Sequence, residues 1–207
     1  MALSEKDLPE NQRANWLKAM SAMELRNYGY AIQLLQSVLK SHPEFLLARQ
    51  LARKAAVAKS AGKKGMLGGF SSASFSTMKV QSLIKKDPVA AMDAAEKILE
   101  TDPYSASVNQ LLKDAALAAK LPEVALFALE TIIQGNPKDT KTMHELAKLY
   151  ISNGLPSKAG DVYNKILEVT PNDLGAIKGG KDAAAGASMQ RGGWEKEGST
   201  YRDLMKD

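Results

Sequence analysis

Hydrophobic residues recur with helical spacing in four short segments of the chain, residues 30–39, 89–99, 123–133 and 157–167. When these segments are aligned, each has an alanine, an apolar residue four positions later and an aliphatic residue three positions after that. Spacing of four and then three places the side chains on one face of a helix, so each segment predicts an amphipathic helix. The three aligned columns are Ala31, Ala91, Ala125 and Ala159; Leu35, Ala95, Leu129 and Tyr163; and Val38, Ile98, Ile132 and Ile166. We expect the alanine column to lie where two helix backbones approach closely.

The eight prolines follow one regular spacing along the chain. Proline lacks an N–H and clashes with the preceding helical turn, so it marks helix starts and the turns between helices. Two prolines in each period bracket one short helix and leave room for a second. The spacing therefore predicts a helix–turn–helix unit repeated every 34 positions, in an all-α protein of about ten helices without a sheet. The prolines in register are Pro9 and Pro43; Pro88, Pro122 and Pro156; and Pro103, Pro137 and Pro171.

The segment 140–173 carries a recognisable set of residues at fixed positions: Leu146, Ala147, Tyr150, Gly154, Ala159, Tyr163, Ile166 and Pro171. This set resembles the tetratricopeptide repeat (TPR) family. The resemblance covers residues 72–173 continuously and residues 12–45 more weakly. It implies a right-handed superhelix of antiparallel helix pairs, which acts as a non-enzymatic scaffold or adaptor for protein–protein interaction and binds a peptide or helix of a partner.

The resemblance also implies that the first helices of the units line a concave groove. Trp16 and Met20 occupy such positions but are better interpreted as core residues of a slipped first helix. The Lys/Asn/Asn/Lys/Arg clamp of the chaperone-binding subclass is not reproduced at the matching positions. The groove candidates are Arg13, Gln110, Asp114, Lys141, His144 and Lys148, with Ser76 and Val80 at the equivalent positions of the unit that begins at residue 72.

The proline spacing is interrupted once, because Pro43 and Pro103 are 60 residues apart, which is 26 more than one period. This break predicts the domain organisation. Residues 1–61 form a first unit followed by a lone helix, residues 62–71 a linker rich in Gly, Ser and Lys, and residues 72–173 three consecutive units. Residues 174–190 form a capping helix, and residues 191–207 a polar tail. We expect the linker to act as a hinge that trypsin cuts at Lys63 or Lys64. The alternative is that Met66, Leu67, Phe70 and Phe75 fold back and plug the gap between the two halves.

Charge is unevenly distributed along the chain. The net charge is +5, yet residues 45–86 contain nine basic residues and no acid. Three interpretations stay open: a solvated helix face with a charged linker, a surface for an acidic protein partner, or electrostatic recruitment to nucleic acid or an anionic membrane surface. The expected basic patch comprises Arg49, Arg53, Lys54, Lys59, Lys63 and Lys64.

No catalytic, cofactor-binding or metal-binding residues are expected. The chain has no cysteine. His144-Glu145 is followed by Lys148 where a zinc site of this type needs its second histidine, and Gly62-Lys63-Lys64 lacks the hydroxyl residue and the preceding strand of a phosphate-binding loop. The N-terminus has no apolar core of a secretory signal, and no apolar run approaches the roughly 20 residues that span a bilayer. We expect a soluble, cytoplasmic protein.

Overall fold

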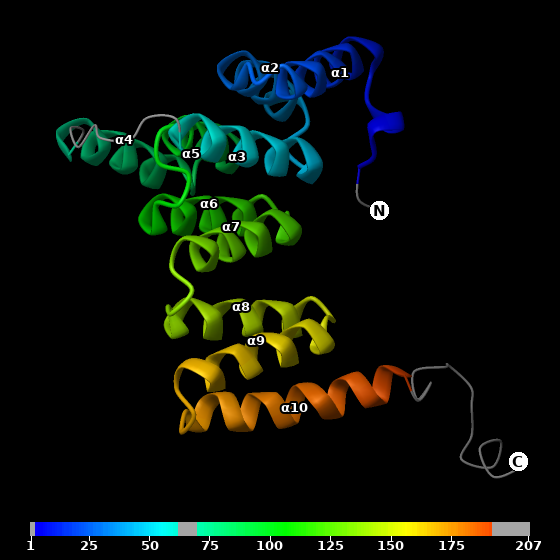
Figure 1. Ribbon diagram of the computed structural model, residues 1–207, viewed down its shortest axis with the longest axis vertical. Helices are drawn as coiled ribbons and strands as arrows, with labels where there is room; N and C mark the ends of the chain where they lie inside the picture. Colours follow the sequence, from blue (N-terminus) through cyan, green and yellow to red (C-terminus); the bar gives the residue numbers. More distant parts are fainter. Residues whose placement is uncertain (1–2, 62–69, 192–207) are drawn as a thin grey trace, which may run out of the picture. The chain divides into compact units, whose positions relative to one another are not determined.

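The computed structural model describes residues 3–61 and 70–191, which form helices joined by short turns (Figure 1). These residues contain ten α-helices, one 3-10 helix and no strand, which confirms the all-α prediction. The chain divides into two compact units, Met1–Gly135 and Asn136–Asp207. The first contains η1 (Glu5–Asp7), α1 (Glu10–Glu24), α2 (Tyr28–Ser41), α3 (Leu46–Ala61), α4 (Phe70–Leu83), α5 (Pro88–Leu99), α6 (Ala106–Ala118) and α7 (Pro122–Gly135), and the second contains α8 (Thr140–Ser152), α9 (Pro156–Val169) and α10 (Leu174–Arg191).

Prolines and aspartates start the helices. Pro88, Pro122 and Pro156 are the first residues of α5, α7 and α9, where the missing N–H costs no helical hydrogen bond. Before α5, the carboxylate of Asp87 accepts a hydrogen bond of 2.9 Å from the backbone N–H of Ala90 and so caps the helix. The proline spacing therefore marked real helix boundaries.

The aligned apolar columns form the interior of the helix pairs. Ala31, Ala91, Ala125 and Ala159 are all fully buried, as predicted for the alanine column. Alanine at this position leaves room for a neighbouring helix, whereas a larger side chain would need the backbones to separate. Leu35, Ala95, Leu129, Tyr163, Val38, Ile132 and Ile166 are buried as well, and Ile98 is partly buried.

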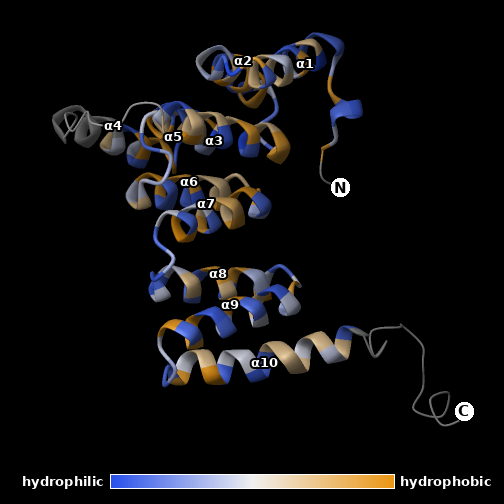
Figure 2. Cartoon of the chain, viewed as in Figure 1, coloured by the Kyte–Doolittle hydropathy of each residue, from blue (hydrophilic) through white to orange (hydrophobic). Residues whose placement is uncertain are grey.

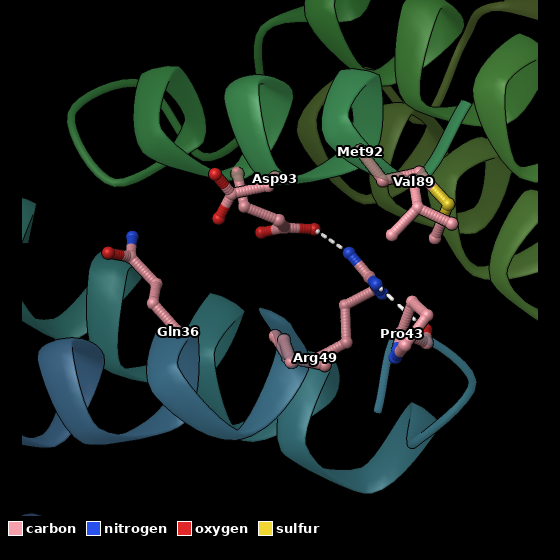
Figure 3. Close-up of a pocket in the computed structure, with 8 residues that line it drawn as sticks. Gln36, Pro43, Arg49, Val89, Met92 and Asp93 are labelled. Carbon is pink, nitrogen blue, oxygen red and sulfur yellow. Dashed lines mark hydrogen bonds and ion pairs between the residues drawn. The ribbon is translucent and has the colours of Figure 1, made fainter. Parts of the chain in front are cut away.

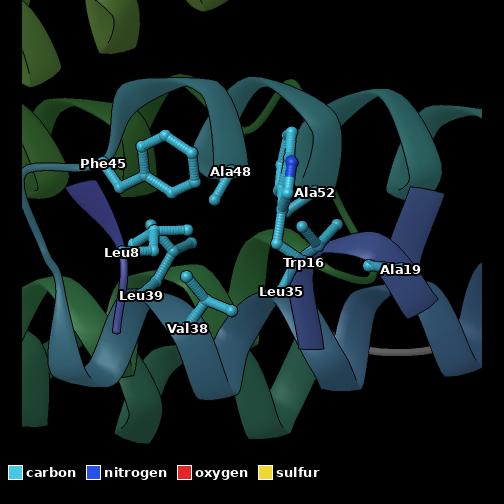
Figure 4. Close-up of a cluster of buried hydrophobic side chains, with 9 residues drawn as sticks. All are labelled: Leu8, Trp16, Ala19, Leu35, Val38, Leu39, Phe45, Ala48 and Ala52. Carbon is cyan, nitrogen blue, oxygen red and sulfur yellow. The ribbon is translucent and has the colours of Figure 1, made fainter. Parts of the chain in front are cut away.

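The first helix pair shares a hydrophobic core with α3 and with the segment before α1 (Figure 4). Trp16 is 6% exposed and its ring meets the ring of Phe45 edge-on, with centroids 5.1 Å apart. The interpretation of Trp16 as a core residue is thus confirmed. The same interpretation of Met20 is wrong, because its side chain is 39% exposed. The buried members of this core are Leu8, Trp16, Ala19, Leu35, Val38, Leu39, Phe45, Ala48 and Ala52.

The helix α3 follows the first helix pair and ends at Ala61, where the sequence predicted a lone helix. Its small side chains Ala48, Ala52, Ala55 and Ala56 are buried, and it packs against α2. Because these side chains are short, the backbone of α3 can lie close to its neighbours.

In the second unit, α10 packs along α9 where the sequence predicted a final helix. Its second half, which contains most of its alanines, is pale in Figure 2, and half of its residues are glycine or alanine. Gly179 explains the need for small residues: a Cβ atom there would lie only 2.7 Å from each Cε atom of the Tyr163 ring. The bare backbone of α10 therefore accommodates the tyrosine ring of α9.

Two predicted segments fall mainly outside the described residues. The linker is described only at residues 70 and 71, which belong to α4, and the tail only at Arg191, the last residue of α10. The choice between a hinge and a plug concerns residues 62–69 and side chains of the first turns of α4, which also lie outside the described part.

Candidate functional site

The side chain of the groove candidate Arg13 forms hydrogen bonds within the first unit. Its guanidinium group donates hydrogen bonds to the backbone carbonyls of Glu5, Lys6 and Leu8, and the distances to Glu5 and Leu8 are 3.3 Å. These bonds fasten the segment that carries η1 against α1. The side chain of Asp7 caps the same segment, because it accepts hydrogen bonds from the hydroxyl and the N–H of Ser4, which lower its pKa.

Two further groove candidates lie one turn apart on α6. Gln110 is partly buried and Asp114 is exposed, and Asp114 forms an ion pair of 2.8 Å with the neighbouring Lys113. The candidate Val80 on α4 is fully buried, so its expected exposure in a groove is wrong. Ser76 lies outside the residues whose side chains are described.

The second unit brings three groove candidates onto one side of α8. Lys141, His144 and Lys148 follow the spacing i, i+3 and i+7, and both lysines are exposed. The opposite side of the helix, with Met143, Leu146, Ala147 and Tyr150, is buried.

His144 connects α8 to the start of α10. Its Nε2 lies 3.0 Å from Oδ2 of Asp173, and its ring meets the ring of Tyr163 edge-on at a centroid distance of 6.0 Å. The other carboxylate oxygen of Asp173 accepts a hydrogen bond of 2.8 Å from the backbone N–H of Ala176, which caps α10. The hydrogen bond with His144, followed by that from Ala176, holds the pKa of Asp173 below its ordinary value. The sequence analysis missed this pair, although Asp173 stands one repeat length after Asp139, which caps α8 in the same way.

Two members of the expected basic patch are buried, which corrects that prediction. Arg49 is 1% exposed and Arg53 is 4% exposed. Nη1 of Arg49 lies 2.7 Å from Oε1 of Glu96 on α5, and Nη2 donates to the carbonyl of Pro43 over 3.0 Å (Figure 3). The positive charge of Arg49 is thus neutralised inside the first unit.

Arg53 extends the same network. Its Nη1 donates hydrogen bonds of 2.7 Å to the carbonyl of Pro103 and to Oδ1 of Asn109, and its Nη2 lies 3.4 Å from Glu96. The guanidinium carbon also stands 5.7 Å from the centre of the Phe127 ring, a cation–π arrangement. Burial lowers the pKa of Arg53, and the Glu96 carboxylate opposes that effect.

The remaining patch residues differ in exposure. Lys54 is exposed, Lys59 pairs with Glu100 over 2.6 Å, and Lys63 and Lys64 lie outside the described residues. An exposed surface made of all six residues is therefore excluded.

The described residues hold no group of three or more His, Cys, Asp or Glu side chains placed to bind a metal ion. Within the same ranges, none of the helices is long and apolar enough to cross a bilayer.

Comparison with known proteins agrees with the repeat geometry. Residues 116–182, from the end of α6 into α10, match the tetratricopeptide repeat family. This family match covers about a third of the chain. None of the curated proteins matches the chain.

Several solved structures are similar at low identity. The MamA protein is 18% identical, with 89% of this chain and 87% of that chain covered and a TM-score of 0.42. TTC0263, a thermophilic TPR protein in Thermus thermophilus, is 17% identical, with coverages of 87% and 84% and a TM-score of 0.40. The first TPR of Spaghetti (RPAP3), solved bound to the HSP90 peptide SRMEEVD, is 19% identical, with coverages of 60% and 99% and a TM-score of 0.47.

Proposed function

We propose that this protein is a non-enzymatic scaffold or adaptor, which binds an extended or helical peptide of a protein partner on the first helices of its helix–turn–helix repeats. The side of α8 that carries Lys141, His144 and Lys148 is the observation on which the proposal rests. It is the one place in the described residues where three groove candidates share a helix face, and its two lysines are exposed without an ion pair there. The match of residues 116–182 to the TPR family supports the assignment.

The charge of this face favours a partner segment that carries carboxylates. Two lysines two turns apart attract an acidic segment and speed its association, although each exposed contact contributes little affinity. The pair between His144 and Asp173 orders the surface between them, because it ties the start of α10 to α8. The cytoplasmic location expected from the sequence belongs to the same proposal, and cell fractionation tests it.

A pull-down with a charge-matched control tests the α8 face. The purified chain, the double variant K141E/K148E and the control K165E/K181E are immobilised, and retained proteins are quantified by mass spectrometry. Lys165 on α9 and Lys181 on α10 are exposed, so the control carries the same charge change at other positions. We expect a set of proteins that the wild type and the control retain and the double variant loses.

Equal retention by all three chains would refute the proposal. A loss that follows total charge, equal in both variants and reduced steeply by salt, would instead favour electrostatic recruitment to a polyanion.

A further inference from the structure

We propose that a hollow between α1 and the start of α2 is a second docking surface, which receives an amphipathic helix of a protein partner with an acidic residue. The hollow has a volume of about 440 Å³. It lies in the first unit and does not depend on the α8 face. Leu17, Ser21 and Leu25 line it from α1 and its C-terminal end, and Asn27 and Tyr30 line it from the start of α2.

The apolar residues of this hollow are unusually exposed. The exposed fractions are 48% for Leu17, 81% for Leu25 and 46% for Tyr30. Neighbouring exposed leucines and a tyrosine around a hollow are typical of an interaction surface, whereas apolar residues exposed singly are ordinary.

The chain covers a different side of α1 with its own N-terminal segment. Leu8 is 3% exposed in the core that contains Trp16, and Arg13 holds the preceding carbonyls in place. Leu8 thus belongs to the core on the side of α1 that carries Trp16 and Ala19, whereas Leu17 is exposed. The described N-terminal segment therefore does not occupy the hollow.

The shape of the hollow fits a helix. Leu17, Ser21 and Leu25 follow the spacing i, i+4 and i+8, and Lys18 and Ala22 form the adjacent ridge. The first ridge extends along α1 to its C-cap residue Leu25 over about 12 Å, slightly more than two helical turns, and the second extends over about 6 Å. Ridges of this kind pack against the ridges of a second helix, and an amphipathic helix inserts its apolar anchors into such a groove.

The charge at the edge of the hollow indicates which residue the partner helix carries. Lys18 is the only charged residue among those that line the hollow, and it is exposed. Within the described residues it forms no ion pair, so its ammonium group is available at the edge of an apolar surface. A carboxylate on the incoming helix complements it and sets the orientation of that helix.

Selection of peptides tests the surface directly. A phage-displayed library of 16-residue peptides is selected on the full chain, with the double variant L17Q/L25Q as the decoy. We expect the enriched peptides to carry apolar residues at i and i+4 and at least one acid. Polarisation of the labelled peptide then measures affinity for the wild type, L25Q, K18E and the control L174Q, which changes a leucine that is 79% exposed in the second unit.

L25Q should weaken binding of the peptide about tenfold or more, because burial of a leucine side chain in the complex raises the affinity by at least that factor. L174Q and K141E/K148E should leave the affinity unchanged, so failure here is distinguishable from failure of the α8 proposal. K18E should weaken binding, and a peptide with its acid changed to lysine should restore it.

Absence of enrichment over the decoy, or equal affinity for wild type and L25Q, would overturn the proposal. Sedimentation that shows a wild-type dimer, dissociated by L25Q, would overturn it too, because the occupant would then be a second copy of the chain.

Discussion

Arg49 and Glu96, 47 residues apart in sequence, form a buried ion pair with Nη1 and Oε1 only 2.7 Å apart. The carboxylate of Glu96 also faces Arg53, so one buried acid serves two buried bases. Carbonyls of Pro43 and Pro103 satisfy further N–H groups of the two arginines. This network connects α3 to α5 and α6 through specific polar contacts.

Substitution of Glu96 by glutamine should destabilise the first unit by about 3–5 kcal/mol, because two buried guanidinium groups lose their carboxylate. Urea unfolding of a W194F background, in which Trp16 is the only tryptophan, measures the effect. The control is Glu100→Gln, which breaks the more exposed pair with Lys59 and should cost less than about 1 kcal/mol. Similar losses in both variants would show that the buried network contributes no more than a surface pair.

Residues in the turns between paired helices give a second prediction. Lys120 has a φ of 59° and Gly154, which stands one repeat length later, has a φ of 69°. This left-handed conformation is strained for a residue with a Cβ atom and free of strain for glycine. Lys120→Gly should therefore stabilise the protein by about 0.5–1 kcal/mol, net of the greater freedom of glycine in the unfolded chain.

The matched control for Lys120 is Lys165→Gly inside α9, which should lose about 0.5–1 kcal/mol because glycine disfavours a helix interior. Thermal melts of the two variants compare them directly. A loss of stability in both would mean that the turn does not hold Lys120 in the left-handed region.

Contact between Tyr163 and Gly179 gives a third prediction. A Cβ atom at residue 179 would lie 2.7 Å from each Cε atom of the tyrosine, whereas one at Gly180 would lie 3.7 Å from its Cβ, an ordinary contact. Gly179→Ala should cost about 1–3 kcal/mol through overpacking. Gly180→Ala should be neutral or stabilising by up to about 1 kcal/mol, since alanine favours the helix. Chemical denaturation distinguishes the two, and equal midpoints would indicate that α10 shifts to accept the methyl group.

The helices could be predicted from the sequence because local physics determines them. Proline at the first turn, aspartate at the cap and the alanine column each act within a few residues, and all three recur with the period of the repeat. The repeat spacing also predicted the positions of α3 and α10, because the segments left between and after the repeats have the composition of helices.

The burial of Arg49 and Arg53 could not be predicted in the same way. It depends on Glu96 and Asn109, which lie on other helices far along the chain, and on the Pro103 carbonyl, which no side-chain pattern reveals. The stretch 45–86, which has no acidic residue, was therefore predicted to be an exposed basic patch. The placement of Lys141, His144 and Lys148 on one side of α8 could be predicted, because a spacing of three and four along one helix is a local property. The link from His144 to Asp173 again depends on packing.

The carboxyl group of Asp173 makes the second unit sensitive to acid. The hydrogen bond with His144 is the largest cause of its lowered pKa, and the N–H of Ala176 adds to it. A carboxyl group whose pKa is lower in the folded state stabilises that state at pH above its unfolded pKa, which is about 4, and the contribution disappears as the pH falls through the folded pKa. The start of α10 should therefore open more readily as the pH drops below about 4.

Hydrogen exchange at the Ala176 amide reports this opening, because that N–H donates to Oδ1 of Asp173 over 2.8 Å. In the wild type its protection factor should fall below pH 4. In Asp173→Asn the factor should be lower at neutral pH and should not fall further with acid, because the asparagine does not titrate. Asp161→Asn, at an exposed position on α9, should behave as the wild type. If the protection factors of the wild type and Asp173→Asn change in parallel with pH, another carboxyl group controls the acid response of α10.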